Sequence, residues 1–193
     1  RYVDQMVFEL VCKMIQESIQ KGMKMVPISF NLSKASFEDE PFMQEYMKVF
    51  QQFDIPKEYI EFELLESISM DNSDKLIKVV DTIHKAGFRC ALDDFGSGYS
   101  SMSVLARVPI DIIKLDRSLF QNPYRDIDNF LIVDGLLDIL HHFPVQIVAE
   151  GVEDETVAEH MRQHGCDMIQ GFYYYRPMPM DEFQRLIAEQ GEC

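Results

Sequence analysis

Residues 91–101 read A-L-D-D-F-G-S-G-Y-S-S, the most informative segment of the sequence. An apolar run typical of a β-strand ends in two adjacent acids, Asp93 and Asp94, and a loop rich in glycine and serine follows. Parallel α/β proteins carry their chemistry at the carboxyl ends of their strands. The Asp pair therefore predicts a site at one edge of a parallel sheet, to which other strands should contribute polar residues.

Strands and helices alternate along the rest of the chain. We predict strands over 25–31, 59–65, 89–94, 111–115, 145–149 and 167–172, and helices over 3–21, 40–53, 73–86, 101–107, 127–141, 155–164 and 180–189. Strict alternation predicts an α/β fold with a parallel sheet. An open doubly wound sheet would carry G-x-G-x-x-G after its first strand, and the sequence has no such motif. The remaining architecture is a TIM-like barrel of about eight strands, incomplete at its N-terminus because only six βα units are predicted.

Several helix faces and ends are marked by residue type. In the first helix, helical spacing predicts a buried face formed by Val7, Leu10, Val11, Met14 and Ile15. Asp154 is suited to cap the helix over 155–164, because its side chain can accept a hydrogen bond from the first turn. Gly87 and Gly165 stand where helices should end.

The composition is that of one globular domain. The chain has 193 residues, 47% of them hydrophobic and 26% charged, which excludes a disordered chain. We therefore expect a single domain over 1–193. The chain starts at Arg1, not at Met, and it opens inside a predicted helix, so we expect this domain to be truncated at its N-terminus.

Charge and cysteine content exclude several classes of partner. A net charge of −15 argues against binding a long nucleic acid, although a small nucleotide held through metal ions is compatible with it. No apolar run approaches the ~18 residues of a membrane span. The four cysteines are scattered without a C-x-x-C pair, which indicates reduced thiols and a cytoplasmic location.

Every predicted strand ends in an ionisable or amide side chain. In chain order these residues are Asn31, then Glu63 and Glu66, Asp93 and Asp94, Lys114 and Asp116, Glu150 and Glu153, and finally Gln170. A single acid of this kind is usually a surface residue or a helix cap. Several acids that converge on one edge would repel one another unless cations lay between them.

The residue types at these strand ends indicate which cations would bind. Oxygen ligands without His or Cys suit Mg²⁺ or Mn²⁺. Adjacent acids such as Asp93 and Asp94 can serve two ions, the usual arrangement for phosphodiester hydrolysis. Lys114 could orient the attacking water or neutralise charge in the transition state.

With these motifs in order, the sequence resembles the EAL domain family over essentially its whole length. The matching segments are F-N-L-S at 30–33, E-L-L-E at 63–66, D-D-F-G-S-G-Y-S-S at 93–101, K-L-D-R at 114–117, A-E-G-V-E at 149–153 and Q-G-F at 170–172. The resemblance implies a modified TIM barrel that hydrolyses cyclic di-GMP to linear pGpG with two Mg²⁺ or Mn²⁺ ions in bacterial second-messenger signalling.

The resemblance also implies roles for individual residues. The metal ligands would be Asn31, Glu63, Asp93, Asp94 and Glu150, and the catalytic residues Lys114, Glu150 and Asp93. Lys114 would position the nucleophilic water, and Glu66 would anchor the loop after Asp94. Residues that support the site or contact substrate would be Glu153, Gln170, Arg176 and Pro177.

Two departures from the family pattern are visible. The Glu-Ala-Leu motif that names the family is absent, because the chain begins downstream of it, so one metal ligand and one substrate-contacting Arg are not in this sequence. In addition, Leu65 stands where the family usually has Thr. We therefore expect the longer parent protein to be active, and this fragment to have weak activity or none.

Two other functions compete with hydrolysis. The first is a catalytically inactive receptor for cyclic di-GMP or a protein-interaction scaffold, which would be expected to lose several acids that this chain keeps. The second is a barrel lyase or isomerase with one Mg²⁺, which does not account for the Asp pair and its glycine-serine loop. The resemblance further implies a homodimer and linkage to sensory or GGDEF domains.

Two smaller clusters could in principle form binding sites. His160 and His164 have the i, i+4 spacing of a metal chelate, but no third ligand is evident, so we interpret them as a solvated helix face. The run Tyr173 to Tyr175 could stack on a purine, but we expect it to alternate between the core and the barrel rim.

Overall fold

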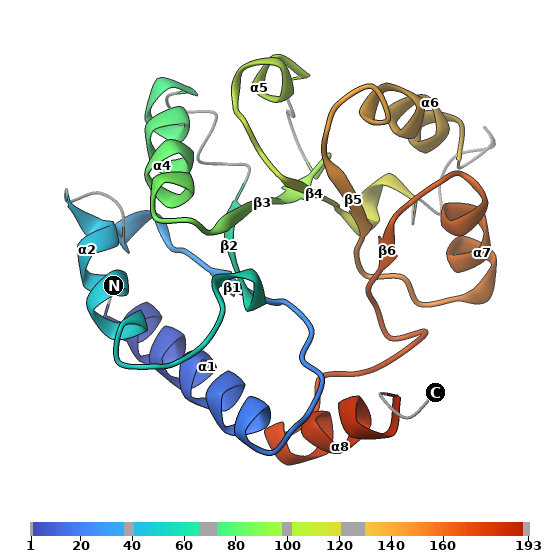
Figure 1. Cartoon of the computed structure of the whole chain (residues 1–193). Helices are drawn as coiled ribbons and strands as arrows, with labels where there is room; N and C mark the ends of the chain where they lie inside the picture. Colours follow the sequence, from blue (N-terminus) through green and yellow to red (C-terminus); the bar gives the residue numbers. More distant parts are fainter. Residues whose placement is uncertain (1, 37–40, 66–72, 98–101, 121–129, 191–193) are drawn as a thin grey trace. The chain divides into compact units, whose positions relative to one another are not determined.

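The computed structural model describes residues 2–36, 41–65, 73–97, 102–120 and 130–190, in which strands and helices alternate (Figure 1). In chain order the elements are α1 (Tyr2–Gln20), β1 (Ile28–Asn31), η1 (Lys34–Ser36), α2 (Phe42–Phe50), η2 (Lys57–Tyr59), β2 (Ile60–Leu65), α4 (Ser73–Lys85), β3 (Arg89–Phe95), α5 (Met102–Arg107), β4 (Ile112–Leu115), η3 (Arg117–Leu119), α6 (Leu131–Leu140), β5 (Gln146–Ala149), α7 (Glu155–Gln163), β6 (Met168–Ile169) and α8 (Met180–Gln190). Each predicted strand and helix has a counterpart among them.

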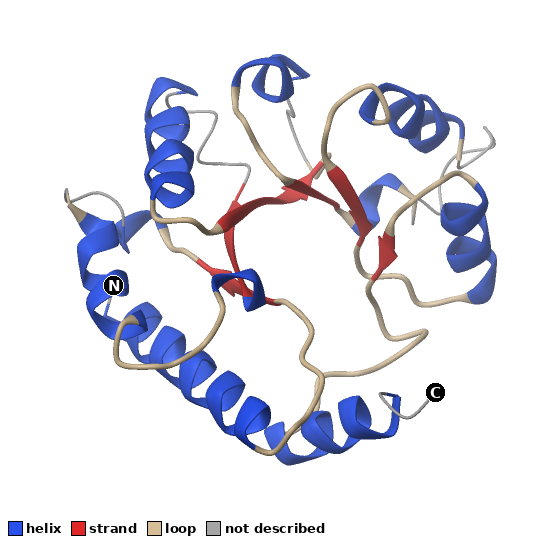
Figure 2. Cartoon of the chain, in the orientation of Figure 1, coloured by secondary structure: helices blue, strands red, loops and turns tan. Residues whose placement is uncertain are grey.

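The strands form a six-stranded sheet whose order follows the chain, from β1 to β6. The pairs β1–β2, β3–β4, β4–β5 and β5–β6 are parallel. Parallel neighbours need a crossover connection, and helices provide it between successive strands (Figure 2). The predicted parallel α/β class is therefore confirmed.

The chain folds into two compact units, and each is described by itself. Unit 1 contains Arg1–Leu64, Lys78–Cys90 and Pro177–Cys193, and unit 2 contains Leu65–Ile77 and Ala91–Arg176. β1 and β2 therefore belong to unit 1, whereas β4, β5, β6 and most of β3 belong to unit 2.

An aromatic cluster fills the core of unit 1. Phe8 of α1 lies with its ring centroid 5.1 Å from that of Tyr46 on α2 and 5.5 Å from that of Phe30 on β1. Phe62 of β2 is 5.7 Å from Phe8 and 5.3 Å from Phe88. Edge-to-face aromatic pairs of this kind add to the free energy of burial. This cluster holds α1 and α2 against one side of the two strands.

The predicted buried face of α1 is partly wrong. Met14 and Ile15 are buried as predicted, but Val7 and Leu10 are 42% and 60% exposed. Phe8 and Cys12 are fully buried in their place. The aromatic cluster explains the difference, because it takes up Phe8 and thereby turns the neighbouring apolar residues toward the surface.

Apolar side chains from three adjacent strands pack on one face of the unit 2 sheet. Ala91 of β3, Ile112 of β4 and Val148 of β5 form a buried cluster. The strand registers pair Ala91 with Ile112 directly. Because side chains alternate between the two faces of a strand, residues two positions further along must point to this same face. The cluster therefore forms the floor beneath the strand ends.

Helix and strand ends confirm some local predictions and correct others. Asp154 caps α7 by accepting a hydrogen bond from the Val157 backbone N–H at 3.0 Å. Gly87 and Gly165 follow α4 and α7 with φ of 86° and 79°, a conformation that favours glycine. β6 is shorter than predicted because the chain turns after Gln170. α6 is described from Leu131, and the predicted residues before Phe130 lie outside the described residues.

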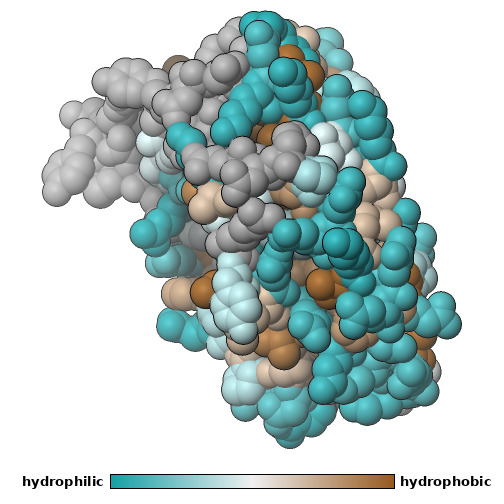
Figure 3. Space-filling view, turned by 90° about the vertical axis from the view of Figure 1, so that its left-hand side faces the viewer, coloured by the Kyte–Doolittle hydropathy of each residue, from teal (hydrophilic) through white to brown (hydrophobic). Residues whose placement is uncertain are grey.

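One face of the molecule presents a mixture of polar and apolar residues. On the face shown in Figure 3, apolar residues are scattered among hydrophilic ones. Among the described helices, none has both the length and the hydropathy that crossing a membrane requires.

Candidate active site

A charged layer lies above the apolar floor of unit 2. Asp93, Lys114 and Glu150 each stand two residues beyond a member of that apolar cluster, at the carboxyl ends of β3, β4 and β5. The Lys114 ammonium Nζ lies 2.5 Å from Glu150 Oε1 and 3.7 Å from Asp93 Oδ1. The Lys114 side chain is only 7% exposed, and that of Glu150 is 17% exposed. The structure thus brings together the three residues predicted to be catalytic.

Asp94 joins this group through an unusual backbone conformation. It has φ of 57°, and it alone among the described non-glycine residues has a positive φ. Such residues store strain and concentrate at functional sites. The Asp94 backbone N–H donates to Asp93 Oδ1 at 3.0 Å. Ligand oxygens of Asp93, Asp94 and Glu150 all lie within 4.8 Å of one another.

Burial and the neighbouring charges of this layer shift the pKa of Glu150. Burial raises the pKa of Glu150 to about 7. The hydrogen bond from Lys114 and its positive charge oppose that rise, whereas the negative charge of Asp93 adds to it. One buried ammonium is therefore too little to balance the neighbouring carboxylates.

The donor set fits a hard divalent cation. Three carboxylates with oxygen atoms within 4.8 Å can converge on one ion, and oxygen-only ligands favour Mg²⁺ or Mn²⁺. The positive charge of a cation would also oppose the burial and the Asp93 repulsion that raise the pKa of Glu150. The described part of unit 2 therefore contains an acidic cluster suited to metal binding.

Two glycines let η3 pack closely against the loops that carry the acids. A Cβ on Gly96, which follows β3, would lie 2.6 Å from Leu119 Cδ1. A Cβ on Gly151, which follows Glu150, would lie 2.9 Å from Arg117 Cβ. Both glycines also have positive φ, 93° and 65°. Only glycine satisfies both the space and the backbone at these positions.

The Q-G-F segment is fixed against the segment after β5. The Gln170 backbone N–H donates to Ala149 O at 2.8 Å, and the Val152 N–H donates to Gln170 O at 3.1 Å. A Cβ on Gly171 would lie 2.1 Å from Val152 O, far inside van der Waals contact. The glycine of this motif is therefore required by backbone packing.

Asn31 and Glu63 occupy matching positions in unit 1. They are register partners at the ends of β1 and β2, and the Leu32 backbone N–H donates to Glu63 O at 2.9 Å. Partners in parallel strands point to the same face, so the two side chains share one side of the sheet. Glu63 is buried. That these two residues complete the metal site of unit 2 stays a prediction.

The predicted supporting residues are more exposed. Glu153 pairs with Arg117 across 3.6 Å, and both are well exposed. Gln170 is exposed at the end of β6. The Arg176 guanidinium lies 4.7 Å from the Phe172 ring centroid, just before Pro177. Glu66 lies outside the described residues, as does the loop over 98–101. Substrate contacts for this set stay a prediction.

Two smaller interpretations are wrong. The tyrosines over 173–175 do not alternate with the core, since each is 40% to 50% exposed in a turn that follows β6. The histidine pair of α7 is not merely a solvated face. His160 Nε2 lies 2.6 Å from Asp134 Oδ1, so α6 supplies a third candidate ligand. Only the packing of α7 on α6 could identify Asp134, which no sequence spacing links to the histidines.

Comparison with known proteins defines the family. The family model for the EAL domain matches residues 1–177. The chain therefore belongs to the EAL domain family, and the resemblance noted from its motifs is confirmed.

Relatives and solved structures agree with this assignment. Cyclic di-GMP phosphodiesterase PdeB of Shewanella oneidensis is 30% identical over 168 residues, or 85% of this chain and 20% of PdeB. The EAL domain of Mycobacterium smegmatis DcpA is 28% identical, with a TM-score of 0.86 over 95% of this chain and 82% of that one. The PaMucR phosphodiesterase in its c-di-GMP complex is 27% identical, with a TM-score of 0.86 over 94% of this chain and 74% of that one. The fold is thus an EAL-type, TIM-barrel-like fold of which this chain supplies part.

The chain spans about a quarter or less of the length of the curated relatives it matches. Activity, substrate and partners of the whole protein are accordingly taken up as proposals.

Proposed function

We propose that the protein to which this chain belongs hydrolyses cyclic di-GMP to linear pGpG by a metal-dependent mechanism with two Mg²⁺ or Mn²⁺ ions. The observation that carries this proposal is the group of Asp93, Lys114 and Glu150 at the ends of three adjacent strands. A relative named as a cyclic di-GMP phosphodiesterase and a structural neighbour with bound c-di-GMP support the choice of substrate.

The proposed roles follow from the chemistry of each side chain. Asp93, Asp94 and Glu150 would hold the ions together with Asn31 and Glu63. When bound, the two ions would lower the pKa of an attacking water and neutralise charge that develops on the phosphate. The positive charge of the ions would keep those carboxylates ionised.

Lys114 has a separate role in this proposal. Its ammonium lies buried between Asp93 and Glu150, where it can donate hydrogen bonds in a fixed direction. It would orient the nucleophilic water toward phosphorus and balance part of the negative charge in the transition state. An uncharged amide at this position could donate a hydrogen bond but could not balance that negative charge.

The proposed setting is a longer signalling protein. We take residues 1–193 as a single EAL-like domain, truncated at its N-terminus, whose parent joins it to sensory or GGDEF domains and forms a homodimer. The missing strands would supply the remaining metal ligand and the substrate-contacting Arg. This arrangement assigns catalysis to the parent protein.

The alternative is an EAL-like receptor or scaffold without activity. The group at the strand ends argues against this alternative. A receptor needs neither a buried lysine beside Asp93 nor a strained backbone at Asp94. Nothing in the described residues favours this alternative over hydrolysis.

A turnover assay on the full-length parent tests the proposal. Cyclic di-GMP is incubated with protein and either Mg²⁺ or Mn²⁺, and nucleotides are separated by chromatography while binding is measured by calorimetry. We expect pGpG to accumulate only when a divalent cation is present. Binding without turnover in both metals would select the receptor alternative, and absence of both binding and turnover would reject the substrate.

A further inference from the structure

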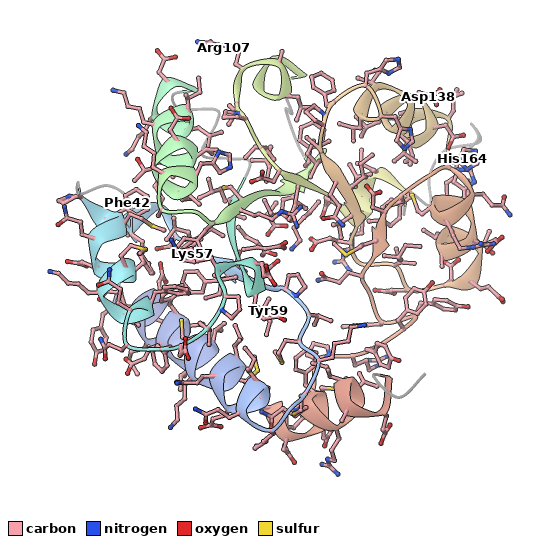
Figure 4. The ribbon with its side chains drawn as sticks, viewed as in Figure 1. Phe42, Lys57, Tyr59, Arg107, Asp138 and His164 are labelled. Atoms are coloured by element: carbon pink, nitrogen blue, oxygen red, sulfur yellow. The ribbon has the colours of Figure 1, made fainter. Side chains whose placement is uncertain are left out.

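A second cluster of potential metal ligands lies between two helices of unit 2. Asp134 of α6 and His160 and His164 of α7 place their ligand atoms within 4.8 Å of one another. Figure 4 labels His164 at the end of α7 and Asp138 on α6. None of the three ligands stands at a strand end, and the proposed hydrolysis uses none of them.

The His164 ring is oriented by the backbone. Its Nδ1 lies 2.9 Å from the carbonyl oxygen of His160. Because a carbonyl oxygen only accepts, Nδ1 must donate, and the lone pair of the neutral ring is therefore on Nε2. Nε2 lies 3.9 Å from Asp134 Oδ1. Metal-ligating histidines are commonly fixed in this way, with the other ring nitrogen donating to a carbonyl.

The His160 ring is fixed by stacking on both sides. Its centroid is 3.7 Å from that of Phe130 at an interplanar angle of 17°, and 4.0 Å from that of His164 at 20°. Its Nε2 points at Asp134 Oδ1 across 2.6 Å, and the side chain is only 18% exposed. Stacking therefore holds the His160 ring in place with Nε2 directed at Asp134, and the His164 ring must turn out of the stack before both Nε2 lone pairs can reach one ion.

We propose that Asp134, His160 and His164 form a zinc site that links α6 to α7. Two imidazole nitrogens and one carboxylate suit Zn²⁺, and harder ions such as Mg²⁺ prefer oxygen. With Zn–N and Zn–O bonds of about 2.0–2.1 Å, tetrahedral ligand atoms lie about 3.3 Å apart. The two distances to Asp134 Oδ1, 2.6 Å and 3.9 Å, bracket that separation.

Binding at this site would replace the hydrogen bond between His160 and Asp134. Without metal, His160 Nε2 and Asp134 Oδ1 share a hydrogen bond. A neutral imidazole carries one N–H, so a proton on Nε2 would move to Nδ1 of the same ring when Nε2 binds the metal. The described residues place three candidate ligands here, so water would complete a four-coordinate site.

Cobalt titration tests this site, because Co²⁺ takes the geometry of Zn²⁺ and absorbs visible light. The protein is the whole chain with Asp94→Asn and Glu150→Gln, which removes ligands of the proposed catalytic centre. We expect a visible Co²⁺ band at one equivalent, displaced by Zn²⁺, and a rise in Tm with Zn²⁺. Adding His164→Gln should weaken binding by more than about tenfold, because even a residue that only supports a ligand contributes that much to metal affinity.

Two further variants keep the test decisive. His142→Gln changes an exposed histidine at the end of α6 outside the cluster and should leave the cobalt band unchanged. His164→Cys replaces the ligand by a thiol and should restore the band, with an added sulfur-to-cobalt charge-transfer feature. His164 is 41% exposed, so its substitution is compatible with folding. Absence of the band, or an equal band in His164→Gln, overturns the proposal and leaves a His–Asp ion pair only.

Discussion

The described part of unit 2 contains two groups of three potential metal ligands that differ in ligand type, position and charge. Asp93, Asp94 and Glu150 are oxygen donors at strand ends, beside a buried lysine. The other group, Asp134 with two histidines, joins helices α6 and α7 and contains no neighbouring lysine contact among the described interactions. The strand-end group contains a strained residue and is crowded with charge, whereas the helical group is held by one short hydrogen bond and by ring stacking.

This comparison shows how a fold separates two kinds of cation site. Parallel strand ends bring residues distant in sequence to one edge, where like charges accumulate and a hard cation relieves them. Helix surfaces bring together i, i+4 pairs, which need only one partner from a neighbouring helix. The two groups should therefore respond differently to the same changes.

The largest expected difference concerns catalysis. Glu150→Gln in the full-length parent should lower the rate of cyclic di-GMP hydrolysis about 10³-fold, or about 4 kcal/mol, because it removes a charge predicted to hold a metal ion. The matched change Asp134→Asn should leave the rate within about twofold. Initial rates with saturating Mn²⁺ measure both, and equal losses in the two variants would contradict the separation of the groups.

Backbone crowding gives the next largest difference. Gly171→Ala should destabilise the chain by about 3 kcal/mol, because its Cβ would meet the Val152 backbone at 2.1 Å. Gly135→Ala, next to Asp134 in α6, has nothing within 4 Å and should stabilise by up to about 1 kcal/mol. Urea unfolding midpoints measure both changes. A neutral Gly171→Ala would show that the Q-G-F turn can relax.

The two groups should also differ in the pH dependence of stability without divalent cations. Since the pKa of Glu150 is raised from 4.5 to about 7 on folding, the folded state binds more protons between these values. The free energy of unfolding should therefore fall by about 2 to 3 kcal/mol as pH rises across this range. Chelator-treated protein unfolded in urea at several pH values measures the slope.

Controls for the pH experiment follow from the same residue. Glu150→Gln should remove the decline, and saturating Mg²⁺ should offset it at the upper end of the range by favouring the ionised carboxylate. Asp134→Asn should keep the decline. A wild-type slope that survives in Glu150→Gln would assign the effect to another group.

The smallest expected effect is on the helix that carries the histidines. Asp154→Ala removes the side-chain cap of α7 and should cost about 1 kcal/mol of stability. Because α7 holds His160 and His164, zinc affinity should weaken as well, whereas Mn²⁺ binding at the strand ends should not. Thermal melts with and without each metal measure the two effects. Asp154→Asn, which preserves the cap, is the matched control.

The strand-end group could be predicted because each of its residues is marked by the sequence immediately around it. Each strand has its own apolar run and its own polar residue near its end, and the period of two places Asp93 and Glu150 above Ala91 and Val148. The order of elements and the cap at Asp154 were predictable for the same reason.

Features that depend on packing between elements were not predictable. The aromatic cluster decides which face of α1 is buried, so Phe8 and Cys12 replaced Val7 and Leu10 in the core. Asp134 joins the histidines only because α6 packs on α7. The positive φ of Asp94 likewise depends on where the chain turns, and the residue types around it do not identify that position.

The short helix η3 lies against both loops that carry the strand-end acids. Through Leu119 it lies against Gly96, two residues after Asp94, and through Arg117 it lies against Gly151, next to Glu150. η3 therefore helps to fix the positions of the loops after β3 and β5. An altered side chain in η3 should displace both halves of the acidic group in concert, so that metal affinity could be tuned from a segment that itself never reaches a metal.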